Sequence, residues 1–164
     1  MRSIGIISDT HGLLRPQALA ALQGSALIIH AGDVGDPAIL AALGKIAPVS
    51  AVRGNVDRGP WTKQLPATQI IEFEGHSIHV LHDLNELELD PASAGFHAII
   101  SGHSHRPKIE TKDGVLYFNP GSAGPRRFDL PISAGKLTIS AGRLQAEIID
   151  LGSVATESGV GKGA

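Results

Sequence analysis

The chain has 164 residues, of which 42% are hydrophobic and 18% charged, a composition typical of one globular domain. Its net charge of −2 gives no general attraction to nucleic acid or to an acidic membrane surface. Without cysteine it has neither disulfides nor thiolate ligands, and its apolar runs are too short for a signal peptide or a membrane span. We therefore expect a cytoplasmic protein without membrane contact, with a single domain over residues 1–152 and a flexible tail over residues 153–164.

The first half of the chain alternates apolar runs with helical patterns. We expect strands at residues 4–7, 26–31 and 49–52, and helices at residues 15–22 and 36–45 between them. An acidic N-cap followed by proline opens the second helix. This alternation indicates parallel strands joined by right-handed crossovers.

The second half has the pattern of hairpins. Residues 68–82, 108–119 and 131–151 each predict two strands joined at a turn that contains glycine. Together the two halves favour an α/β protein with a mixed sheet, or with two sheets packed face to face. Residues 54–68 form the longest stretch without a pattern, and a loop of this length in a compact domain is often functional.

Polar side chains follow five of the apolar runs at the point where each run ends. They are Asp9, His11, Asp33, Asn55, His82, His103 and His105. The carboxyl ends of parallel strands share one edge of a sheet, so we expect these side chains to lie close together. Seven ligands are too many for one catalytic ion with open positions, and they fit two ions that share a bridging carboxylate.

Each of these residues also has an ordinary structural explanation when it is taken alone. Asp9 and His11 fit a turn or a helix cap, and Gly32-Asp33 and Gly54-Asn55 fit tight turns. His82 fits a packed core histidine, and the pair His103 and His105 fits a solvated turn. Their joint occurrence in order, each at a strand exit, favours a binuclear metal site.

The same segments resemble the motifs of a known superfamily. "DTHG", "GD", "GNVD" and "GHSH", with one further strand-exit histidine, resemble the blocks of the calcineurin-like metallophosphoesterases, and "FNPGS" resembles their small single-domain phosphodiesterase branch. The resemblance covers about residues 1–150 and implies two packed mixed β-sheets flanked by helices, a four-layer αββα sandwich. It implies that one ion is held by Asp9, His11 and His105, the other by Asn55, His82 and His103, with Asp33 bridging the two.

The activity implied by this resemblance is that of a binuclear metal-dependent phosphoesterase, with a phosphodiesterase favoured, in which a metal-bridging hydroxide attacks phosphorus in line. A phosphomonoesterase or nucleotidase of the same fold is an alternative. A catalytically silent protein-binding scaffold, as in the retromer branch, is an alternative of another class, which the intact ligand set disfavours. Mn²⁺ is the favoured metal, with Fe, Ni²⁺ or Zn²⁺ also compatible with oxygen and nitrogen ligands. We expect a small phosphoester substrate, no nucleic acid beyond short oligonucleotides, and a homodimer as one option.

Asp33 and Asn55 would act in catalysis as ligands. Asp57 would orient a ligand or a water, although a turn role explains it equally well. Val56 stands where many relatives carry a histidine that resembles a general acid. The leaving group would then take its proton from another group or from water, or would be a good leaving group such as an aryl oxygen.

Two further residues leave alternatives open. Asp83 stands where relatives commonly have glycine, and it begins an acidic loop that is either a solvated surface or a device that disfavours highly anionic substrates. His30, inside the second strand, is either a packed core residue or a group that supports the metal ligands.

Overall fold

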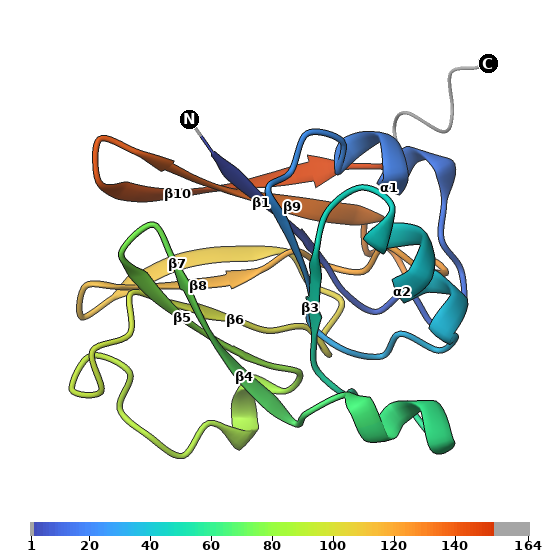
Figure 1. Cartoon of the computed structure of the whole chain (residues 1–164), viewed down its shortest axis with the longest axis horizontal. Helices are drawn as coiled ribbons and strands as arrows, with labels where there is room; N and C mark the ends of the chain where they lie inside the picture. Colours follow the sequence, from blue (N-terminus) through green and yellow to red (C-terminus); the bar gives the residue numbers. More distant parts are fainter. Residues whose placement is uncertain (1, 153–164) are drawn as a thin grey trace.

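This computed structural model describes residues 2–152 of the chain. Two five-stranded sheets form the centre of this part (Figure 1). The first sheet has the order β10-β9-β1-β2-β3, with β1 at Ser3–Ile7, β2 at Leu27–His30, β3 at Val49–Ala51, β9 at Ser133–Ser140 and β10 at Arg143–Asp150. The second has the order β4-β5-β6-β8-β7, with β4 at Thr68–Phe73, β5 at His76–Leu81, β6 at Ala98–Ile100, β7 at Lys108–Lys112 and β8 at Val115–Asn119.

Both sheets are mixed. The pairs β1–β2, β2–β3, β5–β6 and β6–β8 are parallel, whereas β9, β10, β4 and β7 pair with their neighbours in antiparallel fashion. The parallel first half and the three hairpins expected from the sequence are thereby confirmed.

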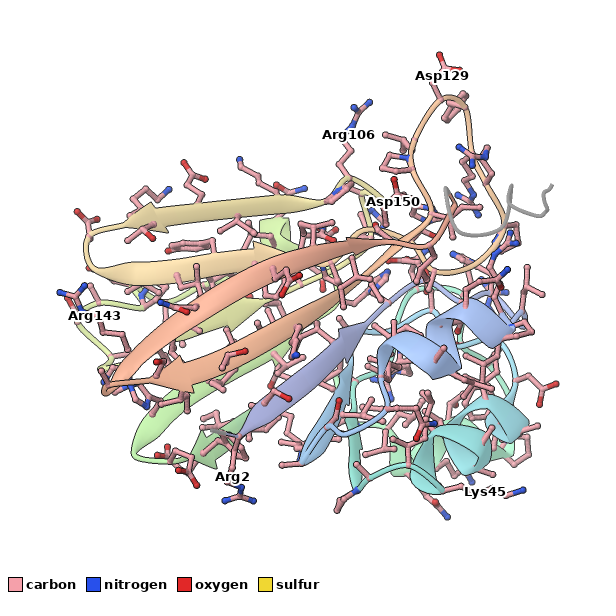
Figure 2. The ribbon with its side chains drawn as sticks, turned by 90° about the horizontal axis from the view of Figure 1, so that it is seen from above. Arg2, Lys45, Arg106, Asp129, Arg143 and Asp150 are labelled. Carbon is pink, nitrogen blue, oxygen red and sulfur yellow. The ribbon has the colours of Figure 1, made fainter. Side chains whose placement is uncertain are left out.

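The core between the sheets is built from alternate residues of the central strands. Ile4 and Ile6 of β1 face Ile78 and Val80 of β5 within one buried cluster that also contains Phe118. This period of two leaves the other strand positions to face outward. Charged side chains such as Arg2, Lys45 and Arg143 lie at the periphery (Figure 2).

Two α-helices cover the outer face of the first sheet. α1 spans Pro16–Ala21 and α2 spans Pro37–Gly44, and both contribute to the buried cluster on this side. α2 begins as expected, because the Asp36 carboxylate accepts a hydrogen bond from the Ala38 N–H at 2.9 Å. A 3₁₀ helix, η1, occupies Pro60–Gln64 in the segment without a sequence pattern.

The outer face of the second sheet is covered by a loop, residues 83–97. The loop contains one 3₁₀ helix, η2 at Leu84–Glu86, and a turn at residues 91–95, where the implied four-layer sandwich has a helix. Leu87 and Phe96 from this loop pack on the sheet. The two packed mixed sheets are confirmed, and the fourth layer of the sandwich is this loop. Pro91 and Gly95 within this segment disfavour a long helix.

The expected flexible tail at residues 153–164 lies outside the described residues, and the single domain stays a prediction. Within residues 2–152, none of the helices is both long enough and apolar enough to cross a bilayer.

Candidate metal centre

The seven predicted metal ligands all lie at one edge of the molecule, where β1, β2, β3, β5 and β6 end. Two groups of three can each offer ligand atoms within 4.8 Å of one another: Asp9, His11 and His105 form one, and Asp33, His82 and His103 form the other. The seventh residue joins the second group, since Asn55 Oδ1 lies 3.2 Å from His103 Nδ1.

Asp33 lies between the two groups. Its Oδ2 atom is 3.1 Å from His82 Nε2 in the second group and 3.5 Å from His11 Nε2 in the first. Asp9 also faces both, because its Oδ1 lies 3.4 Å from His105 Nε2 and 3.9 Å from His82 Nε2. The two groups therefore form one continuous cluster.

Three buried polar atoms of the cluster residues have no hydrogen-bond partner among the described residues: Asp9 Oδ1 and His11 Nε2, which face the cluster, and His105 Nδ1. A buried polar atom without a partner is rare in folded proteins and costs about 1–3 kcal/mol. A divalent cation would satisfy Asp9 Oδ1 and His11 Nε2 at once, and a set of oxygen and nitrogen donors without sulfur suits Mn²⁺, Fe, Ni²⁺ or Zn²⁺. The residues present thus fit a metal site.

The backbone at the site is held in an unusual conformation. Five site residues have a positive φ, between 47° and 72°, which side-chain-bearing residues rarely adopt: Asp9, His11, Asp33, His103 and His105. Such strain persists only where the surroundings enforce it, and it gathers at functional sites.

Two glycines allow the strand-exit loops to approach closely. A Cβ atom at Gly102 would overlap Ser8 Oγ and lie 2.7 Å from Asp9 Oδ2, and one at Gly54 would overlap the Asp33 carboxylate. The glycines in "GHSH" and "GNVD" are thus required by packing around the carboxylates.

Each carboxylate is fixed through one of its oxygens. Asp9 Oδ2 accepts hydrogen bonds from Ser8 Oγ at 2.7 Å and from the His103 N–H at 3.0 Å, while Asp33 Oδ1 accepts one from the Val56 N–H at 3.0 Å. The other oxygen of each carboxylate is left to face the cluster.

The His82 imidazole is oriented by a similar contact. The His82 Nδ1–H donates to the Ala31 carbonyl at 2.8 Å, which directs Nε2 into the cluster. Burial lowers the pKa of His105, which favours the neutral form that can bind a metal.

His82 and Asp33 are coupled through their contact. Burial lowers the pKa of His82, but the Asp33 hydrogen bond and the Asp9 charge outweigh it and raise that pKa to about 9. Burial raises the pKa of Asp33, while hydrogen bonds from His82 and the Val56 N–H outweigh it and lower that pKa to about 2. Without metal the two form an ion pair, and His82 binds an ion only after losing its proton.

His30 is both a core residue and a support for the site. It is fully buried, and this burial lowers its pKa to about 4. Because the Gly32 N–H donates to Nδ1, the proton is on Nε2, which donates to Thr10 Oγ1 at 3.0 Å. Thr10 in turn donates to the Val34 carbonyl at 2.8 Å. This chain joins the exits of β1 and β2.

Asp57 holds together the loops that carry two of the candidate ligands. Its carboxylate accepts hydrogen bonds from the backbone N–H groups of Val34, Gly35 and Gly54 at 2.9–3.2 Å. These bonds tie the loop of Asp33 to the loop of Asn55, so Asp57 positions both.

Asn119 was missed as a supporting residue by sequence reasoning. Its Nδ2 donates to the Gly102 carbonyl at 3.0 Å and to Ser104 Oγ at 3.2 Å, and its Oδ1 accepts from the Gly121 N–H at 2.9 Å. Asn119 ends β8, so the strand-exit rule that selected Asn55 could have found it too.

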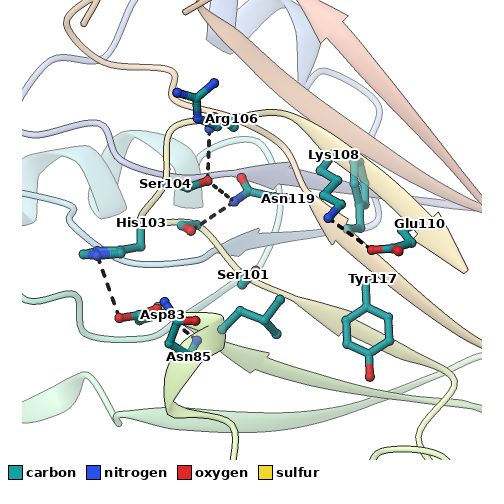
Figure 3. A pocket seen from close by; sticks show the side chains of 13 residues that line it. Asp83, Asn85, Ser101, His103, Ser104, Arg106, Lys108, Glu110, Tyr117 and Asn119 are labelled. Carbon is teal, nitrogen blue, oxygen red and sulfur yellow. Dashed lines mark hydrogen bonds and ion pairs between the residues drawn. The ribbon is translucent and has the colours of Figure 1, made fainter. Parts of the chain in front are cut away.

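Asp83 supports the second group from outside. Its Oδ2 lies 3.7 Å from His103 Nε2 (Figure 3), whereas Asn55 Oδ1 lies near the other ring nitrogen, Nδ1. A carboxylate next to the outer nitrogen of a ligating histidine is a common arrangement in metal sites. The sequence marked Asp83 as a departure from relatives without showing this contact.

Comparison with known proteins gives a family. The family model described as the calcineurin-like phosphoesterase superfamily domain matches residues 1–142. A probable metallophosphoesterase of Methanothermobacter thermautotrophicus is 36% identical over 161 residues, covering 91% of this chain and 92% of that protein. One of Methanocaldococcus jannaschii is 37% identical over 161 residues, covering 90% and 81%.

Solved structures share the fold at lower identity. A protein described as a novel archaeal phosphodiesterase has a TM-score of 0.74 at 23% identity, covering 90% of this chain and 99% of its own. Vps29 of Chaetomium thermophilum also has a TM-score of 0.74, at 17% identity, covering 90% and 96%. By sequence match and by fold, the chain belongs to the calcineurin-like phosphoesterase superfamily.

Proposed function

We propose that the chain is a binuclear metal-dependent phosphodiesterase. The observation that carries the proposal is the cluster of two ligand groups with Asp33 between them and with buried, unpartnered Asp9 Oδ1 and His11 Nε2 facing it. In this proposal Asp9, His11 and His105 hold one ion, Asn55, His82 and His103 hold the other, and Asp33 is shared.

Two divalent ions bound there would activate a water for attack on phosphorus and neutralise the charge that develops on the phosphoryl oxygens. The chain's own groups keep the ligands in place. Ser8 and the His103 N–H fix Asp9, the Val56 N–H fixes Asp33, and Asp57 holds two of the ligand loops together. Little reorganisation is then needed when the substrate reacts.

Charge near the second group favours a diester over a monoester. A small cavity beside Asn55, His82 and His103 is also lined by Asp83, Glu86 and Arg53. The two carboxylates outnumber the one guanidinium, so these side chains repel a phosphate with two negative charges more than a phosphate with one. The name of the archaeal phosphodiesterase with this fold agrees with this choice.

The leaving group should be one that departs without a proton donor. Val56 is 42% exposed next to the Asp33 carboxylate, and its side chain has no proton to give. Esters of acidic alcohols, such as aryl esters, need no general acid. We expect aryl diesters to be cleaved faster than alkyl diesters.

The first test is hydrolysis of bis(4-nitrophenyl) phosphate by chelator-stripped protein before and after Mn²⁺ is restored. Activity should return with Mn²⁺ and fall more than about a hundredfold in Asp33→Asn, because even supporting contacts at metal sites are worth about 10- to 100-fold. Asp36→Asn is the control, because it makes the same change three residues away. Asp and Asn both cap a helix well, so α2 keeps its N-cap and the variant should keep full activity.

The alternatives make distinct predictions in this assay. A faster rate on 4-nitrophenyl phosphate than on the diester would make the protein a phosphomonoesterase. Failure to cleave either ester with Mn²⁺, Ni²⁺ or Zn²⁺ would contradict the proposal and favour the scaffold.

A further inference from the structure

A cavity of about 300 Å³ lies beside the candidate metal centre (Figure 3). Its volume is at the lower end of the range for small-molecule sites, so it could hold one ring system but not an oligonucleotide. Asp83 and His103 line both this cavity and the smaller one that contains Asn55 and His82. A substrate whose phosphorus lies at the metal centre can therefore extend a substituent into it.

The cavity lies between the second sheet and the start of the loop at residues 83–97. One wall is the outer face of the second sheet, where Tyr117 of β8 pairs with Glu110 of β7. The opposite wall is the start of the loop, with Leu84 and Asn85.

The walls combine apolar surface with a balanced set of charges. Leu84 is 41% exposed, which leaves its apolar side chain free for contact, and Tyr117 adds an aromatic ring. Lys108 is paired with Glu110 at 3.2 Å, and Arg106 and Asp83 are the other Arg, Lys, Asp or Glu residues of the lining. Two basic and two acidic side chains cancel, which favours an uncharged ligand group over a second phosphate.

We propose that this cavity is the subsite for a planar aromatic substituent of the phosphodiester, a ring of about the size of a nucleobase. Its position next to His103, its apolar walls and its cancelled charges support this occupant. It agrees with the leaving-group argument from Val56, because a ring directly bonded to the ester oxygen also makes that oxygen a good leaving group.

The proposal rests on the proposed phosphodiesterase function, and its test separates ring binding from leaving-group acidity. Two symmetric diesters are compared, one with aryl groups and one with fluoroalkyl groups of matched acidity. In a symmetric diester the subsite meets the same group whichever side leaves. We expect kcat/KM for the aryl diester to be higher by about tenfold, an ordinary gain for partly burying one ring. Equal values in the wild type would overturn the subsite.

Substitutions of Leu84 test the apolar wall of the cavity. Leu84→Ala should bring the aryl-to-fluoroalkyl ratio close to one, whereas Leu84→Met should restore most of it. Ile109→Ala is the matched control, because Ile109 is as exposed as Leu84, at 45%, and lies between Lys108 and Glu110 on β7 but outside the cavity lining. A wild-type ratio in Leu84→Ala would contradict the proposal.

If neither diester is hydrolysed, the proposed phosphodiesterase function is contradicted. A binding measurement then still tests whether the cavity binds a ring. In Zn²⁺-loaded protein, phenylphosphonate should shift the backbone amide NMR signals of Asn85 and Tyr117, and methylphosphonate should not. Identical shifts with the two phosphonates would overturn ring binding whether or not the protein is an enzyme.

Discussion

Asp9 and Asp33 illustrate how single residues are prepared for a metal. Each has one oxygen held by hydrogen bonds and the other directed into the cluster, and each has a positive φ. Neighbours therefore set the direction of the free oxygen before any ion binds. This arrangement lowers the reorganisation needed on binding, and it explains why the backbone tolerates strain here.

Replacing Asp83 should weaken metal binding without removing a ligand. Asp83→Asn keeps the oxygen that accepts the Asn85 N–H but loses the charge next to His103 Nε2. The His103 ring is 42% exposed, so we expect a loss of Mn²⁺ affinity near the lower end of the usual range, about tenfold, by calorimetry. Asp90→Asn, in the same loop, is the control, because the Asp90 carboxylate accepts hydrogen bonds from the Ala92 N–H and Ser93 Oγ and belongs to neither ligand group. Equal affinity in both variants would show that Asp83 does not support His103.

His30 should make the protein less stable in acid. The pKa of His30 is lowered from 6.5 to about 4 by burial, so between these values the unfolded chain binds a proton that the folded chain does not. Its contribution is therefore fully present above about pH 6.5 and is lost as the pH falls toward 4, by up to about 3 kcal/mol. Urea unfolding of metal-free wild type and His30→Gln measures this difference. A variant with the same pH dependence as the wild type would contradict it.

The sequence predicted the positions of the candidate metal ligands but not the contacts that hold those ligands in place. Apolar runs followed by Asp, Asn or His locate the strand exits, because side-chain period and strand order follow from local pattern. The contacts of Asn119 and Asp83 depend on segments far apart in the chain, so no local pattern reveals them.

At the level of elements, the β6 exit depends on glycine. Gly102→Ala would push a Cβ into Ser8 Oγ and the Asp9 carboxylate, so we expect both a loss of about 1–3 kcal/mol of stability and weaker metal binding. Gly44→Ala is the control, because a Cβ there meets nothing within 4 Å at the end of α2, and it should be neutral or stabilising by up to about 1 kcal/mol. Thermal unfolding and Mn²⁺ titration of both variants measure the two effects. Full metal affinity in Gly102→Ala would count against the close fit.

The loop at residues 83–97 is the element that sequence reasoning described least well. Its charges were recognised, but two interpretations stayed open, and the cavity it forms with β7 and β8 was not foreseen. Tyr117 and Leu84 belong to a strand and a loop separated by more than thirty positions. Only the register of β7 against β8 and the path of the loop bring their surfaces to the same cavity.

At the level of the whole molecule, the metal centre should stabilise both sheets together. Its candidate ligands follow three strands of the first sheet and two of the second, so unfolding either sheet would release them. At a free Mn²⁺ concentration of about 100 times the Kd, the gain is about 2.7 kcal/mol, or about 5–10 °C in Tm for a domain of this size. Calorimetry with Mn²⁺ and with chelator should show one transition that moves by this amount, and much less in Asp33→Asn. A transition that stays at the same temperature when the site is saturated would mean that the ions bind the unfolded chain equally well, which a site assembled from five strand ends should not allow.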